Sequence, residues 1–97
     1  MKVIDYMKKI KFIELDVLKP NNLKVLDLAN EVASIGASYS VSIKVMERDR
    51  ETESTQIFVE ADNIDYGKLI KKIEDSGATV HSIDVIGVGP KPTKIWK

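Results

Sequence analysis

The chain has 97 residues, no cysteine, and fifteen acidic residues balanced by fifteen basic ones. This length suits a single domain, and the absence of cysteine excludes disulfides, zinc–thiolate sites and thiol catalysis. A net charge of zero gives no support to nucleic-acid or membrane binding, and no segment is apolar for long enough to be a signal peptide or a membrane span. We expect a cytoplasmic protein of one domain, residues 1–97, with a core over about 10–88, a short N-terminal extension and a proline- and lysine-rich tail.

The chain begins its regular structure with an alternating segment at 10–18, which is typical of a strand buried on one side. Pro20 is expected to end this strand, because proline cannot extend a central strand. Asn21 or Asn22 is expected to cap a helix over 23–35. The inward residues of the strand are predicted to be Ile13, Leu15 and Val17.

The helix and the two segments after it follow the same kind of pattern. Gly36 ends the helix, alternation predicts a strand over 38–47, and a charged connection leads to a third strand over 55–61. The expected buried residues of the helix are Val25, Leu28, Val32 and Ile35. Those of the two strands are Val41, Ile43, Val45, Ile57 and Val59.

A second helix and a fourth strand complete the pattern. Asp62, Asn63 or Asp65 is expected to cap the helix, Gly77 ends it, and the strand covers 78–88. The predicted buried stripe of the helix is Tyr66, Leu69, Ile70 and Ile73.

The order of these elements, βαββαβ, predicts an α+β fold: the ferredoxin-like split β-α-β sandwich. Its four-stranded antiparallel sheet has the spatial order fourth, first, third, second, with two helices on one face. The other face must meet water, a ligand or another subunit.

The segment VHSID contains the only histidine of the chain. Alternation places His81 toward the helices with Ile83 and Val85, and it places Ser82 and Asp84 on the opposite face. Histidine, serine and aspartate cannot then converge as a nucleophile–base–acid set, which needs side chains within hydrogen-bond reach. We interpret His81 as a strand residue that satisfies a nearby polar group, and we assign no catalytic residue.

The face without helices is predicted to carry four carboxylates, those of Glu14, Asp16, Glu60 and Asp84. Carboxylates on neighbouring strands repel each other unless they are solvated, protonated or bridged by a cation. Calcium and magnesium take such oxygen ligands. We predict a metal site of Glu14, Asp16 and Asp84, to which Glu60 can contribute. The alternative is a solvated acidic face, or one that the lysines of a partner neutralise.

Phe12 and Phe58 are expected on the same open face. RNA-recognition domains of this fold stack bases on aromatic residues of the first and third strands. Here Glu14, Asp16 and Glu60 would repel phosphate, and the third strand lacks the basic, glycine-rich pattern of those domains. The two phenylalanines instead favour an oligomer interface, and we expect a homo-oligomer larger than a dimer with a cyclic arrangement.

Charge is distributed unevenly along the chain. Residues 47–65 contain seven acids and two arginines, whereas the tail after Val85 contains Lys91, Lys94 and Lys97 and no acid. Segments of opposite charge could meet between subunits, where they would contribute specificity more than affinity. A solvated surface position is the alternative for each residue.

Four short motifs resemble an archaeal family of small uncharacterised proteins, domain-of-unknown-function family 211. They are LDVLKP (15–20), ERDRET (47–52), NIDY (63–66) and GATVHSID (77–84). The similarity covers residues from about 10 to 88, and both ends of the chain look like additions. The resemblance implies a ferredoxin-like fold and a ring-shaped homo-oligomer, and it implies no established activity. The matching motif residues are Asp16, Lys19, Pro20, Asp49, Glu51, Asp65, His81, Ser82 and Asp84.

The function predicted from these features is that of an oligomeric binding module. It would bind a small ligand, or a calcium or magnesium ion, at the sheet face or between subunits. One alternative is an enzyme that uses a divalent metal on the carboxylate face, and the other is a purely structural ring. We favour a protein without catalysis, since no P-loop, nucleophile elbow or zinc-protease motif occurs.

Overall fold

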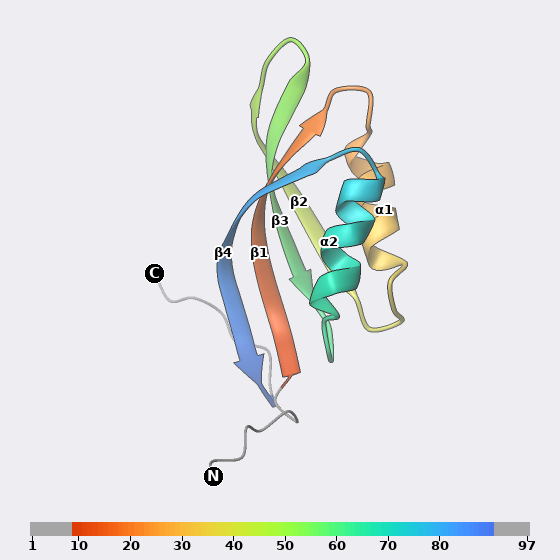
Figure 1. The fold of residues 1–97 in the computed structure, drawn as a ribbon, viewed down its shortest axis with the longest axis vertical. Helices are drawn as coiled ribbons and strands as arrows, with labels where there is room; N and C mark the ends of the chain where they lie inside the picture. Colours follow the sequence, from red (N-terminus) through yellow and green to blue (C-terminus); the bar gives the residue numbers. More distant parts are fainter. Residues whose placement is uncertain (1–8, 91–97) are drawn as a thin grey trace.

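The computed structural model describes residues 9–90, in which strands and helices follow in the order βαββαβ (Figure 1). The N-terminal extension and the tail with Lys91, Lys94 and Lys97 lie outside the described residues. The elements are β1 (Lys9–Pro20), α1 (Val25–Ala33), β2 (Ser40–Arg48), β3 (Thr52–Glu60), α2 (Tyr66–Asp75) and β4 (Thr79–Gly89). No helix in this part of the chain is long and apolar enough to cross a membrane.

The four strands form one antiparallel sheet in the order β2-β3-β1-β4, and both helices lie on the same face of it (Figure 1). This arrangement is the predicted ferredoxin-like α+β fold, because each β-α-β half returns its second strand beside a strand of the other half. No helix or strand within residues 9–90 covers the second face, which is called the open face below.

The core lies between the helices and the helix-facing side of the sheet. Strands present every second residue to this side, and helices present residues spaced by three or four. The fully buried apolar residues are Ile13, Leu15, Val17, Leu28, Val32, Ile57, Val59, Leu69 and Ile73. All of these were predicted to be inside. The prediction for Tyr66 is wrong, because this residue occupies the first position of α2, one turn before the buried stripe, and remains exposed.

β1 continues two residues beyond its predicted end. Leu18 is the last residue of β1 that pairs with β4, whereas Pro20 still pairs with Thr52 of β3. Past Leu18 the strand has a neighbour on one side only, so a proline can be included without removing a ladder hydrogen bond. The extension matters because it carries Lys19 into the sheet.

The two helices begin in different ways. α2 follows Asp65, one of the three predicted caps, whose Oδ1 accepts a hydrogen bond of 3.0 Å from the backbone N–H three residues later. α1 follows Lys24, which provides no side-chain cap. The predicted asparagine cap of α1 is wrong because Asn21 is used elsewhere. Its Nδ2 donates to the backbone carbonyls of Asp49 (3.1 Å) and Arg50 (2.9 Å) and so ties the β1–α1 loop to the β2–β3 hairpin.

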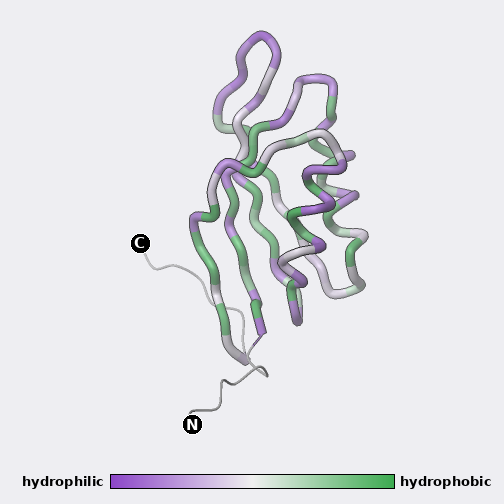
Figure 2. The backbone as a smooth tube through the Cα atoms, viewed as in Figure 1, coloured by the Kyte–Doolittle hydropathy of each residue, from purple (hydrophilic) through white to green (hydrophobic). Residues whose placement is uncertain are grey.

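The phenylalanines of the open face are less exposed than predicted. Phe12 is buried and Phe58 is half-buried. The residue of β4 opposite Phe12 is Gly87, and a glycine there leaves room for an aromatic ring to lie across the neighbouring strand. Three of the exposed apolar side chains of the sheet lie on β4, whose second half is largely hydrophobic in Figure 2: Ile83, Ile86 and Val88. The other two are Leu18 of β1 and Met46 of β2.

β4 pairs irregularly with β1. The register shifts three times: Lys11 is an extra residue of β1, and His81 and Asp84 are extra residues of β4 without partners of their own in β1. Each bulge interrupts the alternation of side chains. Val85 therefore pairs with Glu14 on the open face, and the prediction that Val85 faces the helices is wrong.

Candidate functional site

Rows of paired residues cross the open face of the sheet, and they set the geometry of the candidate site. Each row is named here after its residue in β1. The Asp16 row consists of Lys44, Gln56, Asp16 and Ser82. The Glu14 row consists of Ser42, Phe58, Glu14 and Val85. The Phe12 row consists of Ser40, Glu60, Phe12 and Gly87.

Asp16 and Asp84 line the same shallow cavity, which has a volume of about 190 Å³. Asp16 is half-buried and Asp84 is exposed. Asp84 reaches the cavity because it is the extra residue of a bulge in β4, next to the Asp16 row. The remaining lining residues are Met46, Ser54, Thr55 and Gln56.

Ser82 orients the carboxylate of Asp84. The Ser82 hydroxyl donates a hydrogen bond of 2.8 Å to Oδ1 of Asp84. Asp84 forms no ion pair within residues 9–90, so its charge is not neutralised by a described side chain. His81 is exposed, and its ring makes no hydrogen bond with the described residues. Serine and aspartate of VHSID therefore meet on one face, and the histidine does not join them.

The other two carboxylates predicted to bind a metal ion lie in rows of their own. Glu14 pairs with Phe58, and Glu60 pairs with Phe12. Neither lines the cavity of Asp16 and Asp84. In the described part of the chain no group of three or more acidic or histidine side chains is arranged to hold a metal ion. The structure thus brings together two of the four predicted carboxylates.

A buried ionic cluster lies on the helix-facing side of the sheet, and the sequence analysis did not identify it. Lys19 is 1% exposed, and its Nζ forms an ion pair with Glu53 and donates to the backbone carbonyl of Pro20 at 3.1 Å. The second carboxylate oxygen of Glu53 accepts from Nε of Arg48. The signal in the sequence was a lysine at an inward position of β1 and a glutamate at an inward position of β3.

A bulge in β2 completes this cluster. The register shifts between Val45 and Glu47, so Met46 has no partner in β3. Arg48 is then paired with Glu53 and lies on the same side of the sheet. The hydrogen bonds from Lys19 and from Arg48 lower the pKa of Glu53, in that order of size, against the opposing effect of burial. Glu53 is therefore a structural carboxylate whose negative charge is balanced by Lys19 and Arg48.

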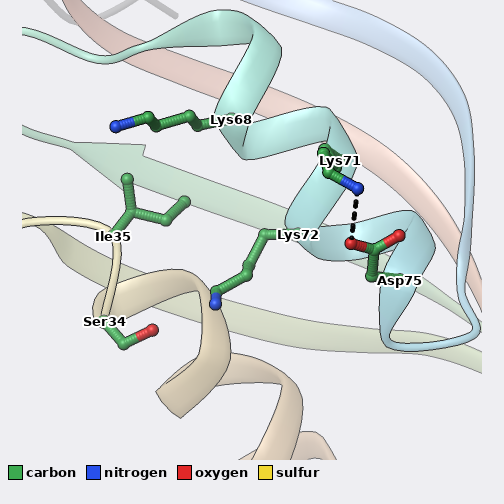
Figure 3. Close-up of a pocket in the computed structure, with 6 residues that line it drawn as sticks. All are labelled: Ser34, Ile35, Lys68, Lys71, Lys72 and Asp75. Atoms are coloured by element: carbon green, nitrogen blue, oxygen red, sulfur yellow. Dashed lines mark hydrogen bonds and ion pairs between the residues drawn. The ribbon is translucent and has the colours of Figure 1, made fainter.

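A second cavity, of about 300 Å³, lies between the two helices (Figure 3). Two of its three lysines are paired with acids: Lys71 with Asp75 at 3.0 Å, and Lys72 with Glu31 of α1 at 3.7 Å. The second of these ion pairs joins α1 to α2. The complete lining consists of Ser34, Ile35, Lys68, Lys71, Lys72 and Asp75.

Comparison with known proteins identifies relatives along most of the chain. Residues 11–95 match the DUF211 family, which is described as "Uncharacterized ArCR". The chain is also similar to the uncharacterized protein MJ0319 of Methanocaldococcus jannaschii. The two are 39% identical over 85 residues, which cover 88% of each chain.

Proposed function

The chain belongs to the DUF211 family, and we propose that it is a cytoplasmic, homo-oligomeric binding module that takes a cation on the open face of its sheet. The observation that carries this proposal is the cavity shared by Asp16 and Asp84. Two carboxylates from adjacent strands face one small volume, and Ser82 holds one of them in place. Such a pair is stabilised when a positive charge lies between its members.

A hard divalent cation is the first ligand to test. Adjacent strands lie about 4.8 Å apart, and calcium accepts carboxylate oxygens at about 2.4 Å, so one ion can contact Asp16 and Asp84 together. The hydroxyl of Ser82 and water would complete its coordination. Glu14 and Glu60 would act through the negative potential of the face, since they lie outside the cavity. The ammonium group of a small ligand is the second candidate for the positive charge between Asp16 and Asp84.

Thermal melting with calcium, with magnesium and with a chelator tests the divalent ion. An ion that binds only the folded protein stabilises it by about 2.7 kcal/mol at a hundredfold excess over Kd. We expect the melting temperature to rise with one of the two ions, and we expect Asp84→Asn to abolish that rise. Glu74→Gln is the matched control, because this exposed acid lies on α2 and away from the open face. A wild-type melting curve that ignores all three conditions contradicts a divalent ion.

The homo-oligomer is the second part of the proposal, with more than two copies in a cyclic arrangement. A small domain with a sheet face that no helix or strand of residues 9–90 covers, and with exposed apolar residues along one strand, has a physical reason to associate. Light scattering at micromolar concentration and physiological salt should give a multiple of the 10.9 kDa chain mass. A mass of one chain would refute this part of the proposal.

A further inference from the structure

The sheet has two edges, β2 and β4, and neither has a neighbour on its outer side among residues 9–90. All adjacent strands are antiparallel, so the two edges of this four-stranded sheet run in opposite directions. An outer β4 can therefore pair with the outer β2 of another copy in the same antiparallel way that the strands pair within one copy. The helices of both copies would then lie on the same face of the joined sheets.

The β4 edge has the composition of a docking edge. Ile83, Ile86 and Val88 are 36%, 49% and 50% exposed, although each is apolar. Residues 85–89 contain no charged side chain. Exposed edges of monomeric sheets are normally protected by lysine, proline or short length, and an apolar edge of this length favours strand addition.

The β2 edge offers matching chemistry on both faces. Its helix-facing residues, Val41, Ile43 and Val45, are half-buried although β2 is a strand of the core sheet. Their exposed sides can cover Ile83 and Ile86 of another copy. Its open-face residues are polar or charged: Ser40, Ser42 and Lys44.

We infer that β4 of one copy pairs with β2 of the next copy, head to tail. The inference rests on the homo-oligomeric part of the proposed function and names the surfaces that form it. Charge complementarity selects this pairing. Lys44 and Ser82 are the two ends of the Asp16 row, so continuing the row into a second copy brings its Lys44 beside Ser82 and beside Asp84, which has no ion pair among residues 9–90. Head-to-tail contacts form a ring when the rotation from one copy to the next closes on itself, which is the arrangement inferred for this protein.

A two-fold pairing of β4 with β4 is the competing arrangement. It would bury the same apolar residues, but it would leave Lys44 outside the interface and so remove it as a partner for Asp84. It would also give a dimer in place of a ring. Lys44 of the neighbour and a divalent ion are alternative partners for Asp84, so the test must depend on neither charge.

Cysteine cross-linking provides such a test, because the chain has no cysteine of its own. Ser42→Cys on β2 and Val85→Cys on β4 lie at the two ends of the Glu14 row, on the open face. Both variants keep every charge. Each is treated alone, and then as a mixture, with a short flexible bismaleimide that tolerates a register shift of two residues.

Head-to-tail pairing gives a cross-linked dimer in the mixture of the two variants and none with either variant alone. The chain that carries both substitutions should give a ladder of multiples that ends at the size of the ring. Cross-linking of Val85→Cys with itself, without a product specific to the mixture, overturns the inference in favour of two-fold pairing. Absence of cross-links from a protein that light scattering shows to be oligomeric overturns it and leaves the homo-oligomer standing. A monomer refutes both.

A disrupting variant adds an independent readout. Ile86→Lys introduces a charge at the centre of the apolar β4 edge and should reduce the assembly to one chain, with the circular dichroism of the wild type. Leu26→Lys is the matched control, because Leu26 is 69% exposed on α1 and belongs to neither edge strand. Ile86→Lys that remains folded and fully assembled overturns the inference.

Discussion

Glu53 and Asp84 are both carboxylates of the sheet, but their surroundings differ. Glu53 is buried between Lys19 and Arg48, and each of its oxygens has a cationic partner. Asp84 is exposed, is held by one serine hydroxyl, and faces Asp16 across a cavity. A carboxylate that its own chain neutralises contributes to folding. A carboxylate that is oriented by a serine and has no cationic partner among residues 9–90 is available to a ligand or to another copy.

The first test of this comparison removes the buried cation, which is the ammonium group of Lys19. Lys19→Met keeps the aliphatic stem but leaves the buried Glu53 with only the exposed Arg48 as a partner, and an uncompensated buried charge is strongly destabilising. We expect a larger loss of stability than for Glu53→Gln, Asp84→Asn or Lys71→Met, measured by the midpoint of urea denaturation. The double variant Lys19→Met with Glu53→Met should recover most of the loss, because no buried charge then remains in this cluster. Equal losses in the single and double variants would contradict this account.

The pH dependence of stability separates the two carboxylates further. The pKa of Glu53 is lower in the folded protein than its unfolded value of about 4.3. Its stabilising contribution is therefore fully present above that unfolded value, and it is lost as the pH falls through the lower, folded pKa. Urea midpoints measured from pH 7 to pH 3 should fall less steeply for Glu53→Gln than for the wild type. Parallel curves for the two proteins would show that this carboxylate is not coupled to folding.

The same measurement on Asp84→Asn should give a much smaller effect. The amide oxygen of the new side chain can still accept the hydrogen bond from Ser82, and no ion pair with a described residue is lost. In the presence of a chelator we expect a change within about 0.5 kcal/mol at pH 7 and at a protein concentration where assembly is unchanged. A loss similar to that of Lys19→Met would mean that Asp84 is a structural residue.

Removal of an exposed ion pair should have the smallest effect on stability. Lys71→Met removes the ion pair with Asp75. The side chain of Lys71 is 76% exposed and that of Asp75 is 61% exposed. Pairs of this type on a helix contribute about 0.3–0.5 kcal/mol, and salt screens them. The urea midpoint should change by no more than this, and the change should disappear at high salt. A larger effect would indicate that the lysines between the helices hold α1 and α2 together.

Several features were predictable because they depend on residues close together in the sequence. Alternation located all four strands, and the buried stripes located both helices, since the periods of two and about 3.6 follow from backbone geometry. The cap at Asp65 is equally local, because its partner is a backbone N–H three residues away. The left-handed φ of +100° at Gly77 explains why a glycine ends α2.

The candidate site was only partly predictable for the same reason. Alternation assigned Glu14, Asp16 and Glu60 to the open face, and the pairing of β1 with β3 is regular, so these positions hold. Whether two carboxylates meet depends on the register between strands that are far apart in the sequence. Asp16 and Asp84 share a cavity, whereas Glu14 lies one row away from it and Glu60 two rows away. No local sequence pattern contains this information about register.

The sequence by itself therefore determined the elements, their order, the buried faces of most of them and the ferredoxin-like architecture, because these follow from short-range periodicity and from the few ways in which βαββαβ packs. The tertiary structure decided three other features. Bulges at Met46, His81 and Asp84 redirect the side chains that follow them, the register places Gly87 opposite Phe12, and the extension of β1 brings Lys19 to Glu53 across 34 residues of chain. Each of these is a contact between strands, and the free energy of such a contact is set by the partner strand rather than by sequence neighbours.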